Sequence, residues 1–242
     1  MCGRYTLTRH EKVVDDLQAS LGMSAQGEWW KPRFNVAPTQ PAPVVTLNDG
    51  KRTVELMRWG LLPHWAGRDG AKPPLMINAR KENLGAKAVF RDALSRKRCL
   101  VPADGFFEWR HEGTGKTAKK QPLWFHPRDH KLFAFAGLWA RARTDAGEIL
   151  SFTIITGPPN DLVKPVHDRM PIVLAESAYD AWLDPTLDGD GARALLGIPS
   201  VGDWVAEPVS KQVNSAHNDD PTCIAAITDD VKPGEEPQGS LF

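Results

Sequence analysis

The residues with the clearest chemical potential stand at the start of the chain, where Cys2 follows Met1. A small second residue permits removal of Met1, which leaves an amine and a thiol on one residue. A free α-amine has a pKa near ~7.7 and a free thiol near ~8.5, so both are readily available at neutral pH. The amine condenses with an aldehyde to a Schiff base, and the adjacent thiol closes a five-membered thiazolidine ring. The first residues therefore predict aldehyde capture.

The residues after the cysteine fit that chemistry. Gly3 permits close backbone approach, and Arg4 is placed to hold a phosphate or a carboxylate beside the nucleophile. The alternative is that Cys2 is only a small hydrophobic residue that packs in the core.

Two further polar residues are candidates for proton transfer. Glu108 stands between Phe107 and Trp109, where an apolar environment would raise the pKa of its carboxyl. Its alternative role is the outward residue of an alternating strand. His167 is the natural proton shuttle near pH 7, and the neighbouring Asp168 is expected in a turn.

Candidates for binding groups complete the set. Asn78 is placed to stabilise an oxyanion or to fix the terminal amine, and a turn or cap is its alternative role. Arg80 and Arg169 are candidate phosphate clamps, against the default of solvated surface arginines.

Composition describes an ordinary globular chain with no global attraction to a polyanion. The 242 residues include 30 basic and 30 acidic side chains, so any nucleic-acid site must be a local cluster. No apolar run of membrane-spanning length and no signal peptide is present, which predicts a cytoplasmic protein. Three widely spaced cysteines favour reduced thiols over disulfides or a zinc site, and no cofactor is expected.

The elements that must position these residues are short strands and a few helices. A capping box at Thr8–Glu11 predicts a helix that Gly22 ends, and Asn48-Asp49-Gly50 predicts a hairpin. A helix is expected over 83–96, and short helices over 177–183 and 191–196. Strands are expected over 98–103, 106–110, 123–126, 132–140, 149–156 and 204–209. This antiparallel meander predicts an α+β fold with a β-rich core, in one domain over 2–227 with an acidic tail over 228–242.

Seven blocks in one order resemble the SOS response-associated peptidase family, over about Cys2 to Pro221. They are Cys2-Gly3-Arg4, Phe34-Asn35-Val36-Ala37-Pro38, Arg58-Trp59-Gly60-Leu61, Asn78-Ala79-Arg80, Gly105-Phe106-Phe107-Glu108-Trp109, His167-Asp168-Arg169-Met170-Pro171 and Pro208-Val209-Ser210. The resemblance implies a single domain with a barrel-like core and a groove for single-stranded DNA. It also implies self-removal of Met1 and a thiazolidine crosslink to the opened sugar of an abasic site.

The resemblance also implies roles for individual residues. Cys2 matches the nucleophile, Asn78 the residue that positions it, and Glu108 the acid/base for Schiff-base formation. His167 matches the group that assists sugar ring opening and crosslink reversal. The matching DNA-binding positions are Arg4, Asn35, Pro38, Trp65, Arg80 and Arg169, with Pro38 and Trp65 as apolar groups that wedge or stack against bases.

Two other functions compete with DNA crosslinking. The first is a cysteine peptidase that acts on other proteins, with Cys2 as nucleophile and His167 as base. The second is a non-covalent reader of modified DNA bases that uses aromatic residues. In each case a monomer is expected, active at the nucleoid during replication if DNA is the target.

The last residues suggest a protein partner. Gln238-Gly239-Ser240-Leu241-Phe242 is similar to the bacterial motif that binds the replication sliding clamp, in which a Leu-Phe pair enters a pocket and Gln238 bonds its rim. We predict that deletion of residues 238–242 abolishes clamp binding, measured by surface plasmon resonance, and leaves DNA crosslinking intact. Equal clamp binding by the full and shortened chains would refute the motif.

Overall fold

Five strands close on one another to form a barrel. The computed structural model describes residues 2–21, 31–66, 74–113, 119–144, 147–198, 200 and 202–227. The strands follow the order β11, β10, β7, β4, β5, and β5 returns to β11 by a parallel pairing. Their bounds are β4 Pro41–Asn48, β5 Lys51–Trp59, β7 Arg98–Ala103, β10 Phe133–Thr144 and β11 Gly147–Gly157. The other pairings in the ring are antiparallel, which confirms the expected α+β fold with a barrel-like core.

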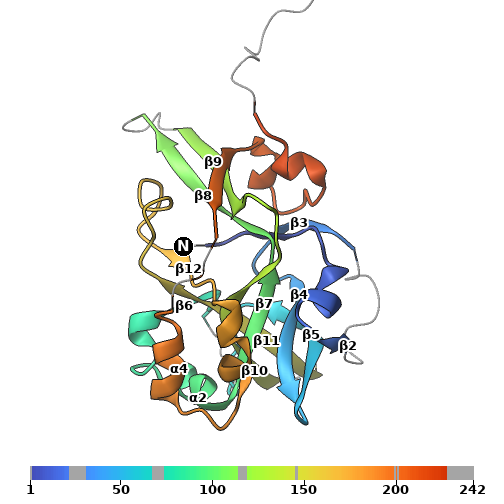
Figure 1. The fold of residues 1–242 in the computed structure, drawn as a ribbon, viewed down its shortest axis with the longest axis vertical. Helices are drawn as coiled ribbons and strands as arrows, with labels where there is room; N and C mark the ends of the chain where they lie inside the picture. Colours follow the sequence, from blue (N-terminus) through green and yellow to red (C-terminus); the bar gives the residue numbers. More distant parts are fainter. Residues whose placement is uncertain are drawn as a thin grey trace, which may run out of the picture.

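A second sheet lies against the barrel and runs toward the top of Figure 1. Its order is β13, β9, β8, β1, β3. The bounds are β1 Tyr5–Leu7, β3 Arg33–Val36, β8 Gly105–Glu112, β9 Lys119–Pro127 and β13 Trp204–Pro208. The chain passes from the barrel to this sheet between β7 and β8, at Asp104. The expected meander is therefore divided between two sheets.

Three short strands attach to the barrel strands. They are β2 Ser20–Leu21, which pairs with β5, and β6 Asn78–Arg80 and β12 Met170–Pro171, which both pair with the end of β11. Because β6 and β12 meet the same stretch of β11, residues far apart in the sequence come together there. The predicted site residues Asn78 and Arg169 lie in or beside these two strands.

The helices lie outside the barrel, with α2 and α4 at its lower end in Figure 1. Their bounds are α1 Lys12–Asp16, α2 Ala88–Arg96, α3 Tyr179–Leu183 and α4 Gly189–Leu195, and the 3-10 helices are η3 Lys81–Asn83, η5 Glu176–Ala178, η6 Lys211–Asn214 and η7 Pro221–Ile224. Arg98 of β7 is buried and donates to the carbonyl oxygens of Trp182 and Ser95, at 2.6 and 3.0 Å. These bonds tie α2 and α3 to the barrel and satisfy carbonyls that the helix ends leave open.

Four local predictions are confirmed. The Asn48-Asp49-Gly50 turn joins β4 to β5, and both Asp49 and Gly50 adopt positive φ, at 49° and 74°. This is the backbone geometry that a tight hairpin turn requires and that Asp-Gly tolerates. The helices expected over 177–183 and 191–196 and the strand over 204–209 are also present within a few residues of their predicted bounds.

Two helix predictions were wrong in detail. The capping box does not form, because Thr8 donates its hydroxyl and its backbone N–H to Asp104, at 2.7 and 2.6 Å, and α1 begins at Lys12 without a side-chain cap. That helix ends at Asp16, and Leu21 lies in β2 instead. The helix expected from residue 83 begins at Ala88, after the separate turn η3.

The core between the barrel and the second sheet is aromatic. Tyr5 packs edge-on against Trp59 and Phe135, with ring centroids 5.2 and 6.0 Å apart, and Phe106 stacks on Phe125 at 5.1 Å. Such pairs contribute about 0.5–1.5 kcal/mol each beyond their buried area. Because Tyr5 anchors β1 in this core, the first residues of the chain are held inside the molecule.

The tail expected over 228–242, with its candidate clamp motif, lies outside the described residues, as does Gly22. No helix in the described ranges is long and apolar enough to cross a membrane.

Candidate active site

The Cys2 side chain is fully buried in the core shared by the two sheets. Its Sγ lies 3.6 Å from the carbonyl oxygen of Arg4. Burial raises the pKa of the Cys2 thiol far above its ordinary value, and the nearby Glu108 carboxylate raises it further. The expectation of a thiol that ionises readily at neutral pH is therefore corrected: in this environment Cys2 holds its proton.

Asn78 contacts the nucleophile residue directly. Its Nδ2 donates to the carbonyl oxygen of Cys2 at 2.8 Å. Asn78 is fixed in turn by β6, whose backbone pairs with Ile154 of β11. Its Oδ1 is buried and has no hydrogen-bond partner among the described residues. A buried acceptor in that position is suited to receive a hydrogen from an amine on Cys2.

Glu108 lies inside the protein. Only 3% of the residue is exposed, so it is not the outward residue of an alternating strand. Burial raises the pKa of the Glu108 carboxyl to about 7, and the positive charge of the chain's amino terminus opposes part of that rise. A carboxyl that titrates near neutrality is suited to both giving and accepting a proton.

His167 lies beside the same space in the segment before β12. Its Nδ1 lies 3.0 Å from the backbone nitrogen of Arg169 and 3.2 Å from the carbonyl oxygen of the same residue, so its donor or acceptor role depends on the tautomer. Burial lowers the pKa of the His167 imidazole, which keeps it neutral at pH 7. Nδ1 also lies 3.0 Å from Oδ1 of Asp168, and the two groups form an ion pair when the ring is protonated. Asp168 therefore contacts the imidazole ring.

Glu108 and His167 line one cavity of about 360 Å³, although 58 residues of sequence separate them. The cavity is also lined by Trp109, His111, Lys120 and Asn214. The fold thus places two proton-transfer groups on the walls of one space, and Asn78 holds Cys2 in the core close by.

Arg4 and Asn35, both predicted to bind DNA, hold the protein together. Arg4 donates to Oδ1 of Asn35 at 2.9 Å and to the carbonyl oxygen of Val213 at 2.6 Å. Asn35 is fully buried, and its Nδ2 donates to the carbonyls of Ser215 and Asn218 at 2.9 and 2.7 Å. This burial favours a structural role over DNA contact for Asn35. Arg4 uses part of its hydrogen-bonding capacity within the protein.

The two other predicted phosphate-binding arginines differ from each other. Arg169 makes a bidentate ion pair with Glu82, at 2.8 and 2.9 Å, and donates to the carbonyl oxygen of Thr156 at 2.8 Å. Arg80 is exposed and has no carboxylate within 4 Å among the described residues. Arg80 is therefore the more available of the two to a phosphate.

The predicted apolar wedge residues lie at the surface. Pro38 is partly exposed in the turn after β3, next to Thr39, whose φ of 74° is unusual for a β-branched residue. Trp65 is 41% exposed. Both positions are accessible to a base, so their predicted stacking roles stay open to test.

Sequence reasoning missed several residues of the cavity wall. Trp109 was noted only as an apolar neighbour of Glu108, yet its Nε1 donates to Oδ1 of Asn214 at 2.7 Å. His111 and Lys120 belong to the β8–β9 hairpin, where they face each other in register. The proximity of these two residues follows from the pairing of β8 with β9, and it cannot be read from single residues in the sequence.

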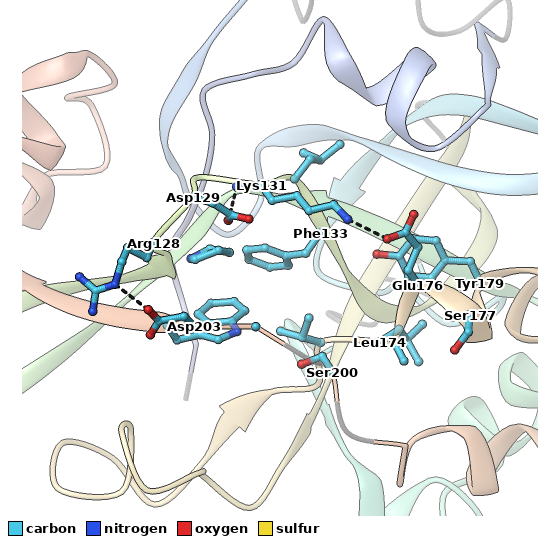
Figure 2. Close-up of a pocket in the computed structure, with 16 residues that line it drawn as sticks. Arg128, Asp129, Lys131, Phe133, Leu174, Glu176, Ser177, Tyr179, Ser200 and Asp203 are labelled. Atoms are coloured by element: carbon cyan, nitrogen blue, oxygen red, sulfur yellow. Dashed lines mark hydrogen bonds and ion pairs between the residues drawn. The ribbon is translucent and has the colours of Figure 1, made fainter.

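A larger cavity, of about 610 Å³, lies apart from these residues and shares none of their side chains. Figure 2 shows Phe133 on its wall, with two ion pairs at its edges, Arg128 with Asp203 and Lys131 with Glu176. Four of the charged side chains that line this cavity are therefore paired with one another, whereas the smaller cavity is lined by Glu108 and His167.

The Glu82–Arg169 pair generates a stability prediction. The hydrogen bond from Arg169 lowers the pKa of the Glu82 carboxyl, so its stabilising effect is present above the unfolded pKa of about 4.3 and is lost as the pH falls through the folded value. We expect Glu82→Gln to lower the melting temperature at pH 7, measured by calorimetry, and the difference from wild type to shrink toward pH 3.

Glu112→Gln serves as the control for this prediction, because Glu112 makes a single exposed contact with Arg110. A melting temperature at pH 7 that falls equally in both variants would contradict a special role for the bidentate pair.

Comparison with known proteins places the chain in a family. A model of the SOS response associated peptidase (SRAP) family matches residues 1–216. The chain is 39% identical over 228 residues to the abasic site processing protein YoqW of Bacillus subtilis, covering 93% of this chain and 99% of YoqW. It is 32% identical to the abasic site processing protein HMCES of Xenopus tropicalis, covering 82% and 67% of the two chains.

The fold agrees with this assignment. A crystal structure of a protein from Bacteroides thetaiotaomicron superposes with a TM-score of 0.79 at 26% identity, covering 94% of this chain and all of the other. The chain therefore belongs to the SOS response associated peptidase (SRAP) family.

Proposed function

We propose that this protein senses and shields abasic sites in single-stranded DNA by forming a thiazolidine crosslink through Cys2 after Met1 is removed. The names of its relatives as abasic site processing proteins support processing of such sites. The observation that carries the finer proposal is the bond from Asn78 to the carbonyl of Cys2. Glu108, which shares a cavity with His167, lies near enough to Cys2 to raise the pKa of its thiol.

The chemistry begins at the amine and not at the thiol. Removal of Met1 hydrolyses one peptide bond and leaves an amine on Cys2, toward which the buried Oδ1 of Asn78 is available as an acceptor. The thiol retains its proton, because burial raises its pKa. The amine therefore attacks the aldehyde carbon of the opened sugar first, and a carbinolamine forms.

The later steps need a proton donor and then the thiol. Protonated Glu108 gives its proton to the carbinolamine hydroxyl, and water leaves as the Schiff base forms. The thiol of Cys2 then adds to the carbon of the protonated Schiff base, and the thiol proton returns to Glu108. The balance is one aldehyde and one aminothiol converted to one thiazolidine and one water.

His167 serves the sugar before capture. An abasic sugar is mostly a closed hemiacetal, and opening it requires proton transfer between its anomeric hydroxyl and its ring oxygen. A neutral imidazole has one nitrogen that donates a proton and one that accepts a proton, so His167 is suited to this exchange. Crosslink reversal passes through the same groups in the opposite direction.

Single-stranded DNA is the favoured substrate on energetic grounds. In a duplex the lesion lies within a base stack, and moving it into a pocket costs a few kcal/mol, whereas a single strand presents it freely. The chain has no net charge, so binding depends on cations local to the cavity.

Self-removal of Met1 is part of the proposal, with Glu108 as the group that exchanges protons at the scissile bond. The rival peptidase function would make Cys2 turn over peptides catalytically, and a non-covalent reader would bind DNA without Cys2. One chain consumed for each abasic oligonucleotide distinguishes crosslinking from both.

The identity of the nucleophile is testable with two variants. We predict that Cys2→Ala abolishes the heat-stable adduct with single-stranded abasic DNA, and that Cys2→Ser prevents ring closure because a hydroxyl is a far poorer nucleophile than a thiol. Denaturing gels with mass spectrometry of the linked peptide provide the measurement. An adduct that maps to any residue other than Cys2 would overturn the proposal.

The role of Glu108 generates a pH prediction. Because the pKa of its carboxyl is about 7, the acid form falls away as the pH rises, so the crosslinking rate should decline above pH 7. Because Glu108 is also proposed to act in Met1 removal, wild type and variant are compared after an aminopeptidase has removed Met1 from both. We then expect Glu108→Gln to react at least about tenfold more slowly and to lack this decline, since general acid–base catalysis contributes about 10²–10⁴-fold. Quenched-flow rates from pH 5 to 9 test it, and a decline kept in Glu108→Gln would assign the titration to another group.

A further inference from the structure

The cavity that holds Glu108 and His167 has a basic wall on the β8–β9 hairpin. His111 of β8 lies directly opposite Lys120 of β9 in the antiparallel register. Both residues are exposed and both line the cavity. Opposed residues on one face of a sheet have their Cβ atoms about 4.5–5.5 Å apart, so the two side chains can contact a single group.

These two basic side chains are available to a ligand, whereas other basic residues close to the site are bonded to protein groups. Arg169 is paired with Glu82, and Arg4 is bonded to Asn35 and to a backbone carbonyl. Within the described ranges, neither His111 nor Lys120 has a carboxylate within 4 Å.

The acidic residues around this wall do not neutralise it. Glu112, on the same hairpin, is paired with Arg110. Glu108 lies buried on the cavity wall, with its pKa raised to about 7, so it is only partly ionised at neutral pH. Exposed Asp168 lies beside His167. The hairpin side of the cavity thus presents a net positive charge to an entering ligand.

The backbone leaves an approach to these cations. Strand β1 pairs with β8 only at Gly105 and Phe106, so β1 does not cover the edge of β8 from Glu108 onward. Trp109 lies along this edge and is fixed by its bond to Asn214. At about 3.3 Å per residue, His111 lies roughly 10 Å along the strand from Glu108.

We propose that His111 and Lys120 together bind a backbone phosphate of a nucleotide that flanks the abasic site. This inference rests on the proposed function and deepens it. The distance from Glu108 to His111 places the bound phosphate beyond the captured sugar. Arg80 and this pair then hold the strand at two separate points, which orients the sugar before the amine attacks.

A matched pair of variants tests the proposal. Lys119 precedes Lys120 on β9 and is also exposed, but it does not line the cavity, so Lys119→Ala removes the same charge from outside the cavity. The ligand is a single-stranded oligonucleotide with a tetrahydrofuran abasic analogue, which cannot open to an aldehyde. Its affinity is measured by fluorescence anisotropy at several salt concentrations.

We expect Lys120→Ala to reduce the slope of log affinity against log salt by about 0.7, the value for one phosphate contact on a single strand. Over a fourfold rise in salt this corresponds to about threefold less salt-induced loss of affinity than wild type shows. Lys119→Ala should leave the slope near the wild-type value. Equal slopes in the two variants would overturn the proposal.

Replacement of single phosphates by uncharged methylphosphonates locates the contact. One flanking position should weaken binding to the wild type and have no effect on Lys120→Ala. His111→Ala should lose the same positional effect, and the double variant should lose less affinity than the two single losses added together. A positional effect that survives in both single variants would refute a shared phosphate.

Failure of this inference is distinguishable from failure of the proposed function. If wild-type protein crosslinks abasic DNA and the two lysine variants bind alike, only the phosphate site is wrong. If wild-type protein forms no adduct with a true abasic site, the proposed function itself fails, whatever the salt slopes show.

Discussion

The hydrogen bond from Asn78 to the carbonyl of Cys2 is the constraint on which the site depends. It fixes the first residues of the chain to β6, and β6 is held by its parallel pairing with β11 in the barrel. Tyr5 anchors the same segment from the other side, through its aromatic contacts with Trp59 and Phe135. The first residues of a chain are ordinarily mobile, whereas Cys2 is held here between strand β6 and the aromatic core around Tyr5.

Burial of Cys2 determines the order of the chemical steps in the proposed crosslinking reaction. The same low-polarity environment raises the pKa of the Cys2 thiol and of the Glu108 carboxyl, because both ions lose solvation there. A neutral thiol is a slow nucleophile toward a free aldehyde, but it adds readily once a Schiff base lies next to it. A carboxyl that stays protonated near pH 7 is the donor that Schiff-base formation requires. The same burial therefore keeps the Cys2 thiol protonated and keeps the Glu108 carboxyl available as a proton donor.

Much of this arrangement was predictable from local sequence, and the rest depends on long-range pairing. The hairpin at Asp49-Gly50 was predictable because few residues tolerate its positive φ. The capping box at Thr8 failed because Asp104, almost one hundred residues away, takes both of the Thr8 donors. The candidates Cys2, Asn78, Glu108 and His167 follow from residue type and family motifs. His111 and Lys120 emerge only from the register between β8 and β9.

The distribution of arginines explains how a chain without net charge can present a cationic site. Arginine offers five donors in a planar group, so it readily satisfies buried carbonyls and carboxylates, and Arg4, Arg98 and Arg169 do this here. Each charge used in this way holds strands or helices together and is less available to a ligand. In the proposed phosphate site the attraction comes from basic side chains that have no carboxylate partner among the described residues, namely His111 and Lys120. Binding through a small number of such contacts is weak and local, which is compatible with the proposed crosslink, because the covalent bond would then hold the DNA.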